Sequence, residues 1–360
     1  MLRLLVTADD RSGALEAAAA CADAGLTPLV LPWQALPVLG AELTRAEDID
    51  CLVVDLGSRH LSGDEAATRC LSVRSLAAGR RVLKMDSTLR GNWPRELEVM
   101  RNGRRALVVP ALPSLGRTCS GGVVLVRGVP VVESEFGADR RNPVRSSRPT
   151  DFCGGSLAAK VEEVRTWLTT SNEAVCVADA LSDSDIRDIV SVIRSDDDAI
   201  VAGTSAVVGE VARVIVGASS RTMSSETTRA QRGPLAVPLV VVCGSRHPVS
   251  RRQAAVARGL PGVAVVQSPD DDLESPHGVA EHLADEAQRA MERTGARTVV
   301  LLGGDTAAAV LGTTPVLVRG GLNSGASWGT ARLEGRDVEV VVKAGGFGND
   351  RFVSDLVGEQ

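Results

Sequence analysis

The sequence predicts an α/β protein of two domains, each built on a mostly parallel sheet flanked by helices. Short apolar runs alternate with alanine-rich stretches of helical periodicity over most of the 360 residues, the pattern of strands covered by helices on both faces. At 44% apolar content the chain is long enough for two hydrophobic cores. A hydroxyl-rich stretch at 218–233 is typical of a linker. We therefore expect domains at 1–220 and 235–360, with a linker at 221–234.

Taken in order, the apolar runs and the periodic stretches place the individual elements. The first domain is expected to have strands at residues 2–7, 29–31, 51–56, 82–85, 106–110 and 174–177, and helices at 12–24, 63–77, 93–102 and 156–169. The second is expected to have strands at 236–243, 263–266, 298–302 and 338–342, and helices at 248–258, 278–293 and 305–311. Residues 133–151, rich in Arg and Pro, are predicted to form a long loop, and such loops are usually functional or mobile.

The composition excludes several classes of function. A net charge of −5 and a pI near 5.6, with no basic stripe beside aromatic residues, argue against a nucleic-acid partner. The seven cysteines are spaced too widely for a C-x-x-C zinc or redox motif and fit a reducing compartment. No apolar run approaches the roughly 18 residues of a membrane helix, and the N-terminus has no signal-peptide core. We expect a cytoplasmic protein with no membrane partner.

Residues 84–92, Lys-Met-Asp-Ser-Thr-Leu-Arg-Gly-Asn, are the most informative segment. The chain has three lysines against thirty-seven arginines, and two of them, Lys84 and Lys343, stand in polar or glycine-rich loops. A compact, strongly hydrated ammonium group is not interchangeable with a guanidinium where it must meet a phosphate or a carboxylate. The two lysines therefore mark candidate anion sites, although chance survival on a solvated face is the alternative for either one alone.

In the first domain, four polar segments follow predicted strands, at residues 7–13, 57–60, 84–92 and 110–117. Open α/β sheets bind ligands at the carboxyl ends of their strands. One Asp or Ser in such a place often only caps the next helix, but four segments together favour a site for a small, polyhydroxylated acid. Their candidate groups are the carboxylates Asp9, Asp10 and Asp86, the cations Arg59, Lys84, Arg90 and Arg117, and the hydroxyls Ser58, Ser87 and Thr88.

In the second domain, three glycine-rich loops follow predicted strands, at residues 242–248, 301–306 and 343–349. Glycines let a backbone approach a ligand closely, and helix N-termini present free N–H groups to phosphate. Three such loops in one small domain predict a nucleotide site. Neither the P-loop G-x-x-x-x-G-K-[ST] nor a G-x-G-x-x-G with a helix behind it occurs in the chain.

These segments, in this order, resemble the four-carbon acid sugar kinase family, which includes D-threonate, D-erythronate and 3-oxo-tetronate kinases. The resemblance runs through nearly the whole chain, and the 84–92 segment is its most specific part. The matching segments are Ala8-Asp-Asp-x-x-Gly-Ala14, Lys84-x-Asp-Ser-Thr-Leu-Arg-Gly-Asn92, Pro110-Ala-x-Pro-x-x-Gly-Arg117, Gly128-x-Pro-x-x-Glu133, Asn142-Pro-Val144, Gly244-Ser245, Gly303-Gly-x-Thr306, Trp328-Gly329 and Lys343-x-Gly345-x-Phe-Gly348.

The resemblance implies a sugar-acid domain at 1–220, an ATP domain at 235–360, an active-site cleft between them and phosphate transfer to a hydroxyl of a four-carbon acid. Phosphoryl transfer also requires Mg²⁺, but the sequence does not identify the ligands of the ion. It also leaves open whether the protein forms a homodimer. We expect Asp86 or Asp10 to serve as the catalytic carboxylate beside Lys84. The substrate would contact Asp10, Ser58, Arg59, Lys84, Asp86, Ser87 and Arg90, and ATP would contact Ser245, Gly303, Gly304, Asp305, Thr306 and Gly345.

Several positions depart from the family pattern. Arg11-Ser12 stands where Leu-Thr is usual, Asp305 replaces a glutamate, His247 replaces a serine, and Ala344-Gly345-Gly346 replaces Ser-Gly-Asn. These changes motivate a second hypothesis, a non-catalytic ligand-binding or regulatory member of the same family. A third, a nicotinamide-dependent oxidoreductase, rests on fold class alone and lacks the fingerprint glycines.

Overall fold

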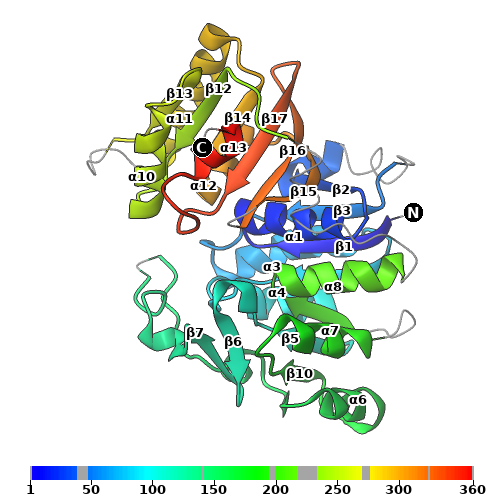
Figure 1. Ribbon diagram of the computed structural model, residues 1–360. Coiled ribbons are helices and arrows are strands. Elements are labelled where there is room, and N and C mark those ends of the chain that lie inside the picture. Colours follow the sequence, from blue (N-terminus) through cyan, green and yellow to red (C-terminus); the bar gives the residue numbers. More distant parts are fainter. Residues whose placement is uncertain are drawn as a thin grey trace.

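The computed structural model describes residues 2–38, 48–139, 141–193, 199–217, 233–269, 276–322 and 325–358. The predicted α/β architecture is confirmed, but both halves of the chain share one mixed sheet of fourteen strands in the order β13-β12-β14-β17-β16-β15-β2-β3-β1-β4-β11-β5-β10-β9 (Figure 1). The predicted linker, apart from residues 233 and 234, lies outside the described residues. None of the described helices has the length and apolar character needed to cross a membrane.

The N-terminal half contributes eight strands, all parallel to their neighbours within the half. They are β1 Leu2–Ala8, β2 Pro28–Pro32, β3 Cys51–Asp55, β4 Ala78–Lys84, β5 Ala106–Val109, β9 Ser156–Ala158, β10 Val175–Ala178 and β11 Ile200–Gly203. β1 lies in the middle, between β3 and β4. After the exposed Arg3, β1 is buried on both faces, and its residues Leu4, Leu5 and Val6 are apolar without alternation.

Helices cover both faces of this half. One face packs against α1 Arg11–Asp23, α6 Val161–Thr170, α7 Asp183–Ser191 and α8 Ser205–Val216, and the other against α3 Gly63–Arg74 and α4 Trp93–Arg101. The short helical turns are η1 Trp33–Ala35, η2 Pro113–Leu115, η3 Val131–Glu133 and α5 Thr150–Cys153. The predicted helix at 156–169 is wrong in its first residues: Ser156–Ala158 form the edge strand β9, too short to show a period of its own.

The C-terminal half places four parallel strands beside an antiparallel hairpin. The parallel strands are β12 Leu239–Cys243, β13 Val263–Gln267, β14 Thr298–Leu302 and β17 Arg336–Lys343, and the hairpin is β15 Val316–Leu322 with β16 Ala326–Leu333. Helices α10 Pro248–Ala257 and α13 Phe352–Val357 pack on one face, and α11 Pro276–Thr294 and α12 Gly304–Leu311 on the other.

The hairpin is what joins the two halves. β15 pairs antiparallel with β2, Val316 opposite Val30 and Leu317 opposite Leu29, and β16 pairs antiparallel with both β15 and β17. The parallel strands of the two halves therefore run in opposite directions. Helix α1 packs against both β15 and α12, and the backbone N–H of Gly321 in β15 donates to Asp23 at the end of α1, 3.1 Å away.

A small three-stranded sheet extends from the N-terminal half after β5. It consists of β6 Arg117–Ser120, β7 Val123–Val126 and β8 Val129–Pro130. The polar residues 133–151, predicted as a loop, follow it and are irregular from Ser134 to Pro149 in their described part, with short helical turns at either end. We call the described part of residues 116–145 the arm; Figure 1 shows its strands on the side of the N-terminal half away from α6.

Candidate functional site

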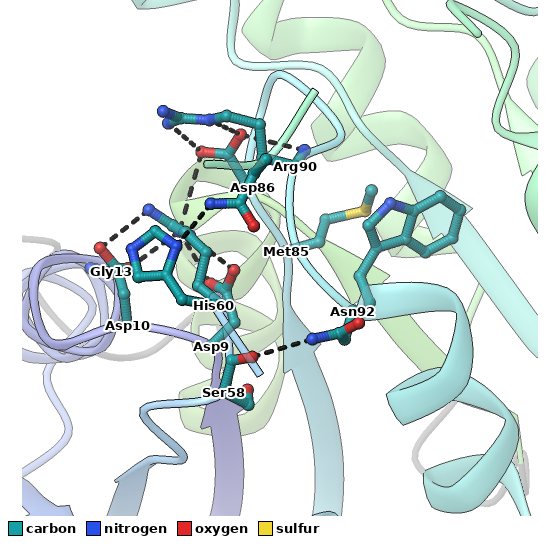
Figure 2. A network of polar contacts seen from close by, with 12 residues as sticks. Asp9, Asp10, Gly13, Ser58, His60, Met85, Asp86, Arg90 and Asn92 are labelled. Atoms are coloured by element: carbon teal, nitrogen blue, oxygen red, sulfur yellow. Dashed lines mark hydrogen bonds and ion pairs between the residues drawn. The ribbon is translucent and has the colours of Figure 1, made fainter. Parts of the chain in front are cut away.

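The turns after three adjacent strands, β3, β1 and β4, bring the predicted acidic and basic residues of the first half together. Figure 2 shows Asp9, Asp10 and Asp86 converging from two of these turns around the segment that carries Ser58 and His60. Parallel strands end at the same edge of a sheet, so neighbouring strands deliver their turns to one place. Contacts among the described residues bring three of the four predicted segments together, those at 7–13, 57–60 and 84–92; their role in binding a substrate stays a prediction.

Arg59 is the central cation of the cluster. Its Nε and Nη2 donate to the two oxygens of Asp9, at 2.7 and 2.8 Å, and its Nη1 and Nη2 donate to those of Asp10, at 2.9 and 3.0 Å. Nη2 also lies 3.8 Å from Oδ1 of Asp86. A planar guanidinium suits such paired contacts with carboxylates. Arg59 therefore holds three carboxylates in a small volume.

Asp86 is fixed by its own segment. Arg90 Nε and Nη2 donate to its two oxygens, at 2.9 and 3.0 Å, and the Thr88 hydroxyl and backbone N–H donate to Oδ2. Burial alone would raise the pKa of Asp86, but Arg90 and Arg59 hold it well below its usual range. Asp86 is thus an ionised carboxylate whose position is set by the 84–92 segment itself.

Asp10 links the cluster to helix α1. Its side chain caps the helix by accepting from the Gly13 N–H at 2.9 Å, and the Ser12 hydroxyl donates to its Oδ2 at 2.7 Å. Lys84 is nearby, because a Cβ on Gly13 would lie 3.2 Å from the lysine Nζ and 2.6 Å from Asp10 Oδ1. Against the effect of burial, Arg59 and Lys84 lower the pKa of Asp10. The capping and the ligand-binding interpretations of Asp10 are therefore compatible.

The two predicted serines lie differently. Ser58 is fully buried, its hydroxyl donates to Glu96 of α4, and its carbonyl accepts from the side chain of Asn92 at 2.9 Å. Ser87 is half-buried and makes no hydrogen bond within the described residues. In this conformation Ser87 is the serine that is open to a ligand, while Ser58 supports the turn. Their contact with a substrate stays a prediction.

A cavity of about 360 Å³ opens beside Arg59 and Arg90. Its polar lining has four arginines, a histidine and two asparagines and contains no carboxylate, and its apolar wall includes Leu89, Trp93 and Phe152. Of its polar lining residues only Arg59 and Arg90 were predicted as site residues; the others are His60, Asn92, Arg141, Asn142 and Arg145. Asn142 Nδ2 lies 2.5 Å from His60 Nδ1. The sequence signals for these residues were the 57–60 segment for His60, the 84–92 segment for Asn92 and the Asn142-Pro-Val144 segment for Asn142, whereas Arg141 and Arg145 had none.

The glycine-rich turns of the second half are held by backbone groups and hydroxyls. The buried Thr306 hydroxyl donates to the Leu302 carbonyl at 3.1 Å and accepts from the Gly244 N–H at 3.0 Å, so it ties the turn after β14 to that after β12. Gly303 has a φ of 118°, which L-side chains rarely adopt. A Cβ on Gly345 would lie 2.6 Å from the Ser245 hydroxyl. The three turns thus form one continuous surface.

Lys343 does not project from this surface. It is 0% exposed, and its Nζ donates to the carbonyls of Ala344 and Phe347, at 2.7 and 2.8 Å. Burial lowers its pKa to about 8. The ammonium group therefore organises the 344–347 turn from within, and the sequence argument that Lys343 meets a ligand anion is not supported in this conformation.

The two sets of turns meet despite the opposite directions of their strands. A Cβ on Gly304, the first residue of α12, would lie 2.9 Å from the Ser12 hydroxyl and 3.2 Å from Asp10 Oδ2. The arm makes two further contacts: Arg141 lies 3.3 Å from Asp305, and Arg117 stacks on Phe347, 5.3 Å from the ring centre. The N-terminal end of α12 thus faces the carboxylate that Arg59 and Lys84 surround.

Comparison with known proteins places the chain. Residues 4–211 match the sugar-binding N-terminal domain family and residues 263–353 the nucleotide-binding C-terminal domain family. The chain is 30% identical to a D-threonate kinase of Bordetella bronchiseptica over 95% of the chain and 94% of that protein. It is 29% identical to a D-threonate kinase of Cupriavidus necator over 84% and 75%.

Solved structures agree in fold. A protein of Salmonella typhimurium LT2 matches 98% of this chain and 98% of its own with a TM-score of 0.73 at 20% identity. A Bordetella bronchiseptica protein, solved with bound citrate as a domain-swapped dimer, matches 99% and 97% with a TM-score of 0.54 at 25% identity. The match to both domain families and the similarity over nearly the full length show that this chain belongs to the four-carbon acid sugar kinase family.

Proposed function

We propose that the protein transfers the γ-phosphoryl group of ATP to a hydroxyl of a four-carbon sugar acid or a closely related hydroxy acid. We call Asp9, Asp10, Asp86, Arg59 and Arg90 the acid–arginine cluster. One observation carries the proposal: the N-terminal end of α12, from the nucleotide-binding half, faces Asp10 of this cluster in the sugar-binding half. Helix N-termini favour phosphate, and carboxylates accept hydrogen bonds from sugar hydroxyls. We place the interdomain active-site cleft between the N-terminal end of α12 and Asp10, with the domains bounded at 1–220 and 235–360.

The cavity beside Arg59 and Arg90 is the proposed seat of the substrate. Its cationic and amide lining, with no carboxylate, suits an anion. The related kinases act on D-threonate, D-erythronate and 3-oxo-tetronate, and one related structure holds citrate. We assign the substrate carboxylate to the arginines that line the cavity. We assign its hydroxyls to Ser87 and to Asp10 and Asp86, which lie outside the lining but pair with the cavity residues Arg59 and Arg90.

The turns of the second half fit ATP. Gly304 leaves no room for a side chain beside Ser12 and Asp10, and a Cβ at Gly345 would close the space beside Ser245. We assign the phosphates to the turns that carry Ser245, Gly303 to Thr306 and Gly345. Mg²⁺ is commonly held by one or two carboxylates together with phosphate oxygens; Asp10 and Asp86 are the carboxylates that fit that task, and the ion would neutralise phosphate charge.

The chain's own groups supply positioning and charge. Asp10 or Asp86 orients the attacking hydroxyl and accepts its proton, and Lys84 and Arg90 stabilise the negative charge of the reacting groups. Removing one such group costs on the order of 3 kcal/mol of transition-state stabilisation, or about 100-fold in rate.

A substrate panel tests the proposal. ADP release is measured with Mg²⁺–ATP and C3 to C6 hydroxy acids, including both threonates and both erythronates, and thermal shifts are recorded with each ligand alone. We expect turnover on at least one four-carbon acid and stabilisation by both ligand classes. Absence of turnover on every acid, with ATP stabilisation intact, would contradict the kinase and favour the non-catalytic member of the family.

A further inference from the structure

Beneath the acid–arginine cluster lies a carboxyl group to which the proposed function gives no task, that of Glu96. It stands in the first turn of α4 and is 0% exposed. Its Oε1 accepts a hydrogen bond from the Ser58 hydroxyl, whereas Oε2 has no hydrogen-bond partner among the described residues. A buried carboxylate with one hydrogen bond for two oxygens is costly, because nothing replaces the water it has lost.

The surroundings of Glu96 also disfavour a charge. From the end of β1, Asp9 adds negative charge, and the nearest cation, Arg59, is already paired with Asp9 and Asp10. On α3, Cys70 contacts the Glu96 carbonyl through Sγ at 3.6 Å, while Arg69 and Arg74 donate to backbone carbonyls. On β4 and β11, which pack against α4, Lys84 is the titratable group at the carboxyl ends. Burial, with Asp9, raises the pKa of Glu96 to about 8.

Glu96 contacts the turn that positions Arg59. The N–H groups of Ser58 and Arg59 donate to the Asp9 carbonyl, at 2.9 and 3.1 Å. From below, the Asn92 side chain donates to the carbonyls of Ser58 and Leu61, both at 2.9 Å, and Glu96 binds the Ser58 hydroxyl. The start of α4 therefore holds the 58–61 turn from one side while β1 holds it from the other.

We propose that Glu96 is a positioning residue that works as a neutral carboxylic acid: bonded to Ser58, it fixes the turn that carries Arg59, and its ionisation loosens that turn. The activity readout of this inference rests on the proposed function. Glu96 is 0% exposed and contacts the turn through Ser58, so its effect reaches the substrate through the residues that this turn positions, Arg59 first among them.

Three variants separate charge from shape. Glu96→Gln keeps the size and the acceptor for Ser58 but cannot ionise, Glu96→Leu removes the acceptor, and Glu98→Gln changes an exposed carboxylate on the same helix as a control. At pH 7 we expect Glu96→Gln to keep kcat/KM near wild type, and Glu96→Leu to lose about tenfold, mainly through a higher KM for the acid. The kcat/KM of Glu96→Gln divided by that of wild type should rise about tenfold between pH 7 and pH 9. With a pKa of about 8, the neutral fraction of Glu96 in the wild type falls about tenfold over this range.

A second readout does not need turnover. The unfolded-state pKa of Glu96 is near 4.5 and the folded-state pKa is about 8, so between these values the folded protein holds a proton that the unfolded chain has lost. Wild type should therefore lose stability relative to Glu96→Gln as the pH rises from 5 to 8, with no further change above 8. We expect the difference in Tm to widen by about 5 °C over that range, and Glu98→Gln to show no such widening.

The outcomes divide cleanly. A Tm difference and a kcat/KM ratio that are both flat with pH would overturn the inference, as would a Glu96→Gln variant as impaired at pH 7 as Glu96→Leu. If wild type turned over no sugar acid, the proposed function would fail, and the Tm difference alone would decide whether Glu96 is neutral in the folded protein.

Discussion

The two halves of the molecule build their turns by different means. In the sugar-binding half, Asp9, Asp10 and Asp86 are held by Arg59 and Arg90, so charge pairs set the geometry. In the nucleotide-binding half, the Thr306 hydroxyl, the buried Lys343 ammonium and closely approaching glycines set it through backbone groups. We therefore expect a change of charge to disrupt the site geometry of the first half, and an added methyl group to disrupt that of the second.

The difference also fits the two proposed ligands. A sugar acid offers hydroxyls and one carboxylate, so its site needs groups of both signs of charge, as this half provides. A triphosphate offers many equivalent oxygens, which backbone N–H groups can meet without side chains. Charged side chains in the first half therefore suit a sugar acid, and backbone N–H groups in the second half suit a triphosphate.

The largest effect on stability should come from Arg11, where the halves meet. This residue is buried, lies 2.7 Å from Asp55 through Nε, and donates to the Gly312 carbonyl at 3.0 Å. Arg11→Ala would leave Asp55 buried without its cation, and we expect a loss of about 3–5 kcal/mol in the free energy of unfolding. Denaturant titration measures it, with the exposed Arg289→Ala as control. A loss below about 1 kcal/mol would mean that Asp55 is solvated in solution.

Next comes the charge of Asp86. Asp86→Asn keeps the shape but removes the negative charge that Arg90 and Arg59 face. We expect kcat to fall about 100-fold, and Tm to fall as well, because the two guanidinium groups lose a buried partner. Asp139→Asn is the matched control, since Asp139 contacts the same Arg90 at 3.3 Å from a more exposed position. Equal losses in both variants would show that the network as a whole, and not Asp86, carries the effect.

The sequence predicted the parallel α/β order and the acid–arginine cluster because both depend on local signals: apolar runs, and polar segments directly after them. It missed the four-residue strand β11, both strands of the hairpin, β15 and β16, the strands β6 to β8 of the arm, and the helices α7, α8 and α13. Continuity of the sheet across both halves depends on the pairing of β15 with β2, far apart in sequence, and no local pattern encodes that contact.

The candidate site divides in the same way. The 84–92 segment fixes Asp86 through its own Arg90 and Thr88, so local sequence sufficed there. The orientation of Lys343 could not be predicted from its glycine-rich neighbours. The side chain is buried, and its ammonium group donates to two carbonyls of its own turn. The task of Glu96 was equally hidden, since a glutamate in a helix is by default a solvated residue.

A third test concerns Gly304 and distinguishes the second half from the first. Gly304→Ala places a methyl group 2.9 Å from the Ser12 hydroxyl and 3.2 Å from Asp10 Oδ2, which separates α12 from α1 by a fraction of an ångström. We expect kcat/KM to fall about tenfold, because a small displacement of the reacting groups is enough for such a loss. Gly259→Ala, where the nearest atom lies 3.5 Å away, should leave activity unchanged. Equal activity in both variants would show that Ser12 and Asp10 can move aside.

The smallest effect should come from the ion pair between the arm and the second half. Arg141 and Asp305 lie 3.3 Å apart with side chains 53% and 82% exposed, and an exposed pair contributes at most about 1 kcal/mol because water and salt screen it. A double-mutant cycle with Arg141→Ala and Asp305→Asn, read by denaturant titration, should give a coupling near 0.5 kcal/mol that shrinks in 1 M salt. A coupling above about 1.5 kcal/mol that resists salt would mean that the pair is buried in solution. The arm would then clamp the two halves together by charge, and the contrast between them would not extend to their boundary.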